Sequence, residues 1–225
     1  MSKEECEHLI EKAKPRMKKS AVLDPRTGER IESKSVYFSR TLERKFKFLN
    51  INASYPFRIR TSSGAFLRRG EDEIIMAIEK RIAQYTFIPT EHGEGFQVLH
   101  YEVGQMYIPH HDYFFDEYII ENKGQRVATL LMYFSDVEEG GETFFPHAEV
   151  NNTSLPWHNE LSQCAKMGLG VKPKMGDALL FYNMKPDATM DPQSLHGGCP
   201  VVRGNKWSAA KWLHLQEWVS QTMTV

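Results

Sequence analysis

Hydrophobic and polar positions divide the chain into a helical first part and a strand-rich second part. Residues 2–19 carry apolar side chains at helical spacing behind Ser2-Lys3-Glu4-Glu5, which fits a capping box. A second helix is predicted over residues 71–85. Its apolar stripe consists of Ile74, Ile78 and Ile82, with Ile75 and Tyr85 beside it. This second helix is expected to pack on a sheet.

From Gly95 onward, short segments rich in β-branched and aromatic residues alternate with Gly, Pro and Asp clusters. These segments are GFQVLHYEV, RVATLLMYFS, GETFF, GDALLFYN and KWSAAKWLHLQEW. The pattern is typical of an antiparallel sandwich or jelly roll, with Val127, Leu131 and Phe134 as core residues. Helices followed by such strands predict an α+β fold.

Composition and charge fit an ordinary globular chain. The 225 residues are 41% hydrophobic and 25% charged, with a net charge of −1. Such a balance gives no global field that would favour nucleic acid as a partner. We find no apolar stretch long enough to span a membrane and no signal peptide. Three sequons begin at Asn52, Asn151 and Asn152, which is a weak indication of a glycoprotein.

A His-x-Asp pair predicts a metal site. Because residues i and i+2 of a strand point to the same face, His110 and Asp112 can aim at one point. His196 supplies a second imidazole, and two histidines with one carboxylate form the facial triad of non-haem iron(II). His111 is a competing ligand, although alternation directs it to the opposite face. A pair of this kind also arises by chance in a chain with nine histidines.

Lys206 begins the last predicted strand. Strand alternation places it on one face with Ser208, Ala210, Trp212 and His214. A lysine buried there needs an anion, because an unpaired buried charge is costly. The distal carboxylate of 2-oxoglutarate would supply one. The alternative is a lysine on the surface.

Long motifs resemble the plant and algal prolyl 4-hydroxylases of the 2-oxoglutarate dioxygenase superfamily. They are RIRTSSGAFLRRGED, GFQVLHYEVGQMYIPHHDYF, GQRVATLLMYFSDVEEGGETFFP, CAKMGLGVKPKMGDALLFYN and DPQSLHGGCPVVRGNKWSAAKWLHL. The resemblance implies a double-stranded β-helix (jelly-roll) core with N-terminal helical support. It divides the chain into a helical support region over residues 1–92 and a dioxygenase domain over 93–217.

The resemblance also implies roles for individual residues. His110, Asp112 and His196 would bind iron(II), and Lys206 would anchor 2-oxoglutarate. Further cosubstrate-binding residues would be Tyr101, Thr143 and Trp212, and the residues facing the peptide proline would be Arg126, Tyr107 and His214. Ascorbate is implied as a further cofactor. A disulfide is implied between Cys164 and Cys199, where the count of three cysteines alone permits one bond and one free thiol.

The sequence differs from the family pattern at its N-terminus and in residues 35–57. Members usually begin with a membrane anchor, which is absent here, so a place in the endoplasmic reticulum or Golgi lumen rests on the resemblance. Residues 35–57 are expected to be a poorly ordered insertion close to the substrate groove.

The expected activity is hydroxylation of peptidyl proline in proline-rich or collagen-like proteins. Tyr107, Tyr113, Phe114 and Trp212 suit an aromatic groove for a polyproline II strand, although Phe114 could equally belong to the core. Alternatives are oxidation of another peptide residue such as lysine, a metal-binding isoform inactivated by the insertion, and a non-catalytic jelly-roll module.

Overall fold

The computed structural model describes residues 1–23, 30–32, 60–149 and 156–219. The expected insertion at 35–57 and the asparagines Asn52, Asn151 and Asn152 lie outside these residues, so both expectations stay predictions. In the described part of the chain, no helix has the length and apolar character needed to cross a membrane.

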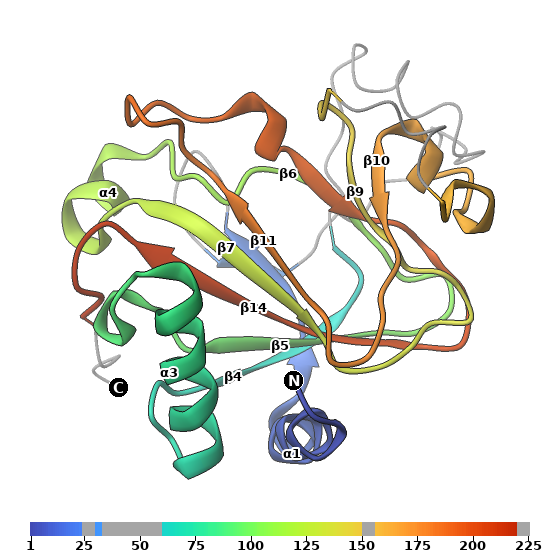
Figure 1. Cartoon of the computed structure of the whole chain (residues 1–225), viewed down its shortest axis with the longest axis horizontal. Coiled ribbons are helices and arrows are strands. Elements are labelled where there is room, and N and C mark those ends of the chain that lie inside the picture. The colour runs from blue at the N-terminus through green and yellow to red at the C-terminus, as the bar shows by residue number, and fades with distance from the viewer. Residues whose placement is uncertain (24–29, 33–59, 150–155, 220–225) are drawn as a thin grey trace.

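Two antiparallel sheets form the framework (Figure 1). The six-stranded sheet has the order β1 (Lys18–Lys19), β4 (Ser63–Leu67), β5 (Phe96–Tyr101), β14 (Lys206–His214), β7 (Arg126–Tyr133) and β11 (Ala178–Tyr182). The four-stranded sheet has the order β10 (Leu169–Val171), β9 (Thr143–Phe145), β12 (His196–Gly198) and β6 (Tyr107–His110). Two short ribbons pair β13 (Val201–Arg203) with β8 (Glu139–Gly140) and β2 (Ala21–Leu23) with β3 (Arg30–Glu32).

Three α-helices and several single turns complete the described fold. The α-helices are α1 (Lys3–Ala13), α3 (Glu73–Thr86) and α4 (Glu117–Lys123). The 3₁₀ turns are η1 (Lys14–Arg16), η3 (Thr90–His92), η5 (His158–Glu160), η6 (Ala165–Met167) and η7 (Pro192–Ser194). The α+β class with a jelly-roll core is confirmed. The division at residues 92 and 93 stays a prediction.

The N-terminal helix is shorter than the pattern predicted. The Ser2 capping box is present, with Ser2 Oγ accepting from the Glu5 amide at 3.2 Å. The helix ends at Ala13 instead of residue 19. Pro15 has no amide hydrogen to donate to an α-helical hydrogen bond, so the chain passes through η1 into β1.

Helix α3 begins after Asp72, whose carboxylate accepts from the Ile75 amide at 2.8 Å. The predicted stripe was wrong by one position, because Ile75 is buried with Ile78 and Ile82, whereas Ile74 is 37% exposed. Burying each isoleucine contributes about 1.5–3 kcal/mol. These side chains anchor α3 on the sheet.

The main core lies between the six-stranded sheet and the helices α1 and α3, which cover the same side of it in Figure 1. Alternate residues of β7, Ala128, Leu130 and Met132, join this core. Phe134 belongs to it as predicted, but Leu131 does not, because it lies on the opposite face of β7 and is half-buried. That opposite face carries the candidate site.

Candidate metal and cosubstrate site

The three predicted metal ligands lie together. His110 ends β6, Asp112 follows it, and His196 begins β12 opposite His110 in the strand register. One ligand atom from each lies within 4.8 Å of the others. Nε2 of His110 is 3.7 Å from Oδ1 of Asp112, and Nε2 of His196 is 3.6 Å from Oδ2. This donor set fits the iron(II) facial triad.

Both histidines are oriented by the same local contact. Nδ1 of His110 lies 2.9 Å from the Ile108 carbonyl, and Nδ1 of His196 lies 2.9 Å from the Ser194 carbonyl. Since a carbonyl oxygen only accepts, each Nδ1 carries the proton and each Nε2 keeps its lone pair for a metal. Nδ1 of His111 instead faces the hydroxyl of Ser194 at 3.3 Å, outside the cluster, as alternation predicts.

Burial sets the protonation of the ligands. It lowers the pKa of His110 to about 3, assisted by the neighbouring His196, so His110 is neutral. Burial alone would raise the pKa of Asp112, but the adjacent His196 and His110 hold that pKa below its usual value. A neutral imidazole and an ionised carboxylate are the forms that bind a cation.

Aromatic rings pack against the two ligand histidines. Tyr107 stacks on His110 with ring centres 3.7 Å apart, and Phe181 lies against His196 at 4.6 Å. Phe145 approaches His196 from 5.9 Å. Tyr107 therefore packs against a metal ligand. The Arg60 guanidinium lies 4.7 Å from the centre of the Tyr107 ring.

Lys206 is a buried cation without a carboxylate partner among the described residues. Its ammonium donates to the Gly141 carbonyl at 2.7 Å and lies 5.7 Å and 5.4 Å from the rings of Tyr101 and Tyr133. Burial lowers the pKa of Lys206 to about 7. The nearby carboxylate of Glu142 is held by the amide and hydroxyl of Ser162. A bound anion would therefore be stabilised beside Lys206.

Hydroxyl groups surround this cation from both sheets. Tyr101 pairs with Lys206 across β5 and β14, and the Tyr133 hydroxyl donates to Thr143 Oγ1 at 2.9 Å. Thr143 in turn pairs with Gly198, which follows His196 on β12. Polar side chains from both sheets therefore lie around Lys206 and beside the strand that carries His196.

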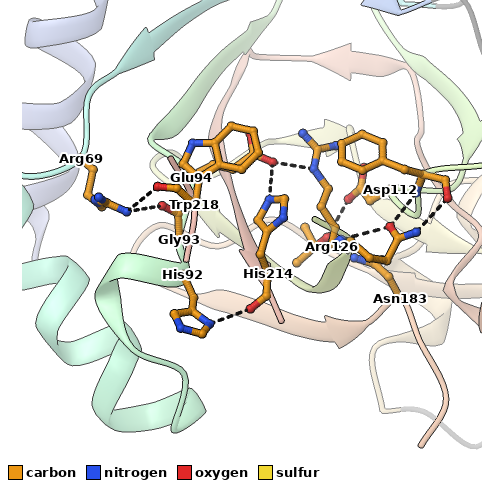
Figure 2. Close-up of polar contacts among 12 residues, drawn as sticks. Arg69, His92, Gly93, Glu94, Asp112, Arg126, Asn183, His214 and Trp218 are labelled. Carbon is orange, nitrogen blue, oxygen red and sulfur yellow. Dashed lines mark hydrogen bonds and ion pairs between the residues drawn. The ribbon is translucent and has the colours of Figure 1, made fainter. Parts of the chain in front are cut away.

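A second polar cluster lies beside the triad (Figure 2). Arg126 Nε and His214 Nε2 lie 2.6 Å and 3.0 Å from the same oxygen of Glu94. The Arg126 guanidinium stacks 3.7 Å from the Trp212 ring centre and 4.5 Å from that of Phe114. Burial would raise the pKa of Glu94, but the positive charge of Arg126 holds it below its usual value.

Trp212, predicted beside the cosubstrate, and His214, predicted beside the peptide, both lie in the Glu94 cluster. Trp212 lies six positions from Lys206, about 20 Å along a strand, and packs on Arg126. Its role with the cosubstrate stays a prediction. The side chain of His214 is fully buried behind Glu94, with the ring of Trp218 4.6 Å away. His214 therefore contacts Arg126 only through Glu94, and its role in peptide binding stays a prediction.

Several residues of the site were missed from the sequence. They are Glu94, Thr129, Tyr133 and Asn183. Alternation along RVATLLMYFS could have found Thr129 and Tyr133, which share a face opposite the apolar set. Glu94 and Asn183 lie just outside strands and carry no comparable signal.

The disulfide joins Cys164 to Cys199, and Cys6 is a free, buried thiol. Cys199 directly follows β12, so the bond ties the strand that carries His196 to the segment around η6. Phe144, Leu161 and Ala165 pack around it as a second small core.

Comparisons with known proteins agree with this geometry. The model of the 2OG-Fe(II) oxygenase superfamily matches residues 96–214. Probable prolyl 4-hydroxylase 3 of Arabidopsis thaliana is 61% identical over 97% of this chain and 68% of its own length. Probable prolyl 4-hydroxylase 10 of the same plant is 58% identical over 97% of this chain and 67% of its own length.

A solved prolyl hydroxylase structure is also similar to this chain. The 2OG complex of the viral collagen prolyl hydroxylase from Paramecium Bursaria Chlorella virus-1 has a TM-score of 0.58 and 25% identity. The match covers 94% of this chain and 90% of the viral one. The chain belongs to the prolyl 4-hydroxylase family of the 2OG-Fe(II) oxygenase superfamily.

Proposed function

We propose that this chain hydroxylates peptidyl proline in proline-rich or collagen-like proteins. The reaction consumes dioxygen and 2-oxoglutarate. One oxygen atom enters the proline ring as a hydroxyl group, the other is incorporated into succinate, and carbon dioxide leaves. The relatives named prolyl 4-hydroxylase and the viral collagen prolyl hydroxylase support proline as the target.

One observation carries the proposal. The described residues hold an iron-type ligand triad and also a buried lysine for which they supply no carboxylate partner. The triad leaves three coordination positions open, which a chelating keto acid and dioxygen would occupy. Lys206 would then pair with the distal carboxylate in a buried, charge-assisted bond.

The protein residues have separate tasks in this reaction. His110, Asp112 and His196 would hold iron(II), which supplies the redox chemistry with dioxygen when bound. Tyr101 and Thr143 offer hydroxyl groups beside the cosubstrate carboxylate. The aromatic rings around the ligand histidines exclude water, so that oxidation is directed at the substrate.

Peptide binding is assigned to the second cluster. Arg126 presents donors at the edge of the site, and Glu94 fixes its guanidinium while His214 fixes Glu94. Trp212 and Phe114 sandwich Arg126. A proline-rich strand is already extended and ordered, so it binds to such an aromatic surface at low entropic cost.

Ascorbate and the compartment also belong to the proposal. Ascorbate would restore iron oxidised in turnovers that do not hydroxylate a peptide. The Cys164–Cys199 disulfide supports an oxidising compartment such as the endoplasmic reticulum or Golgi lumen. Expression of the intact gene product with a fluorescent tag would locate the protein, and residence in the cytosol would contradict this assignment.

The activity is tested with purified protein, iron(II), ascorbate and 2-oxoglutarate, with proline-rich, collagen-like and lysine-containing peptides. Succinate release coupled to one added oxygen on proline is the expected result. His196→Ala should abolish both products, and His100→Ala, which alters a histidine stacked on Trp207, should retain them. Oxidation of lysine alone, or iron binding without succinate, would reject the proposal.

A further inference from the structure

Asp112 is held by a buried chain of two polar side chains. Thr129 Oγ1 donates to Asp112 Oδ2 at 2.7 Å, and Asn183 Nδ2 donates to Thr129 Oγ1 at 3.0 Å. Asp112, Thr129 and Asn183 are 6%, 2% and 0% exposed. Asp112 and Asn183 lie at one end of the network in Figure 2.

Elementary hydrogen-bond chemistry fixes the direction of this chain. The Asp112 carboxylate only accepts, so the Thr129 hydroxyl donates to it. The hydroxyl oxygen must then accept from the amide nitrogen of Asn183, which directs Asn183 Oδ1 away. That Oδ1 is buried and has no partner among the described residues. Among the described residues, the contact that the Asn183 side chain makes is therefore its bond to Thr129.

The backbone of Asn183 reaches the other side of the site. Its amide donates to the Val127 carbonyl at 2.8 Å, and its carbonyl accepts from the Asp191 amide at 3.0 Å. The Asp191 carbonyl accepts from the Ser194 hydroxyl at 2.7 Å, and the Ser194 carbonyl faces Nδ1 of His196. Asn183 thus connects to the supports of two ligands.

We propose that Thr129 and Asn183 are positioning residues that keep Asp112 a one-oxygen metal ligand. The bond from Thr129 engages Oδ2 of the carboxylate, which leaves Oδ1 as the oxygen that would bind the metal. A two-oxygen ligand would occupy a fourth coordination position, which the chelating cosubstrate and dioxygen need. This inference rests on the proposed function, because it assumes that a metal binds to the triad.

Co(II) is a suitable probe because its visible spectrum reports the geometry of its ligands. Thr129→Val removes the hydroxyl at nearly constant shape, whereas Thr129→Ser keeps it. We expect Thr129→Val to weaken Co(II) binding by roughly 10- to 100-fold and to change the spectrum. Thr129→Ser should stay close to the wild type. Thr86→Val, which removes a buried hydroxyl bonded to Ile82 in α3, is the matched control and should change neither property.

Asn183→Ala is a second test, because it removes the side-chain amide that donates to Thr129 and keeps the backbone hydrogen bonds of residue 183. It should weaken Co(II) binding by several-fold, and thermal unfolding checks that each variant is folded. Equal Co(II) affinity and spectrum in the wild type and in the folded variants would overturn the inference and leave the proposed function intact.

A second outcome separates the two proposals. If Co(II) binding differs between the wild type and the variants as expected, but the wild type does not oxidise proline peptides, the function is rejected and the inference stands. No binding to the wild type would overturn both.

Discussion

The protonation of Lys206 predicts how cosubstrate binding depends on pH. Burial lowers the pKa of this lysine to about 7, so part of the cosubstrate-free protein lacks the charge at neutral pH. Under the proposed function, the distal carboxylate of 2-oxoglutarate pairs with the ammonium form of Lys206. Above about pH 7, binding must therefore be accompanied by uptake of one proton.

The magnitude follows from this pKa. Each pH unit above the pKa reduces the protonated fraction about tenfold, so the dissociation constant should rise about tenfold from pH 6 to 8 and about 100-fold from pH 6 to 9. Without cosubstrate, the fold should gain stability as the pH rises from about 7 toward 10.5, because in that window the unfolded chain binds the Lys206 proton and the folded chain does not.

The assay is calorimetric titration of 2-oxoglutarate into the iron(II) protein under nitrogen at several pH values. Lys206→Arg is the matched control, because a guanidinium stays protonated throughout the range. Its affinity, whatever its absolute value, should depend little on pH. A flat wild-type affinity between pH 7 and 9, or an equal slope in Lys206→Arg, would refute the assigned role of Lys206.

Three further predictions concern stability and peptide binding. Lys211→Met leaves Glu79 buried and unpaired, so it should cost about 3–5 kcal/mol, while combining it with Glu79→Leu should restore part of the loss in denaturant unfolding. Additive losses would contradict this. Replacing Cys164 and Cys199 by Ser should lower the free energy of unfolding by about 3–4 kcal/mol, and an unchanged midpoint would show that the bond contributes little. Trp218→Ala uncovers the Glu94 cluster and should raise the peptide KM by roughly 2- to 10-fold without changing the KM for 2-oxoglutarate. Equal changes in both constants would place Trp218 outside peptide binding.

Strand alternation accounts for the position of Lys206 on the inner face of β14. His110 and Asp112 meet as the sequence predicted, although β6 ends at His110 and Asp112 lies in the bend that follows it. Alternation says nothing about partners distant in sequence. Lys211 on the opposite face is buried against Glu79 of α3, 132 residues away, and only the folded structure shows this pair.

The errors in the sequence predictions also have physical causes. The apolar spacing favoured a longer first helix, but Pro15 ends α1 before residue 19. The choice between Ile74 and Ile75 depended on the angle at which α3 packs on the sheet, which the sequence spacing leaves open. Asn183 could not be found because its role depends on a hydroxyl and a carboxylate from two other segments.

The groups proposed to bind the two ends of the cosubstrate belong to different sheets of the fold. Lys206 is part of the six-stranded sheet, whereas His110 and His196 are part of the four-stranded sheet. Under the proposed function, the keto diacid bridges these layers, and packed sheets lie about 10 Å apart. The separation of the sheets then acts as a length gauge. A diacid with one methylene more or fewer cannot chelate the metal and meet the lysine equally well, so the framework itself selects the cosubstrate by its length.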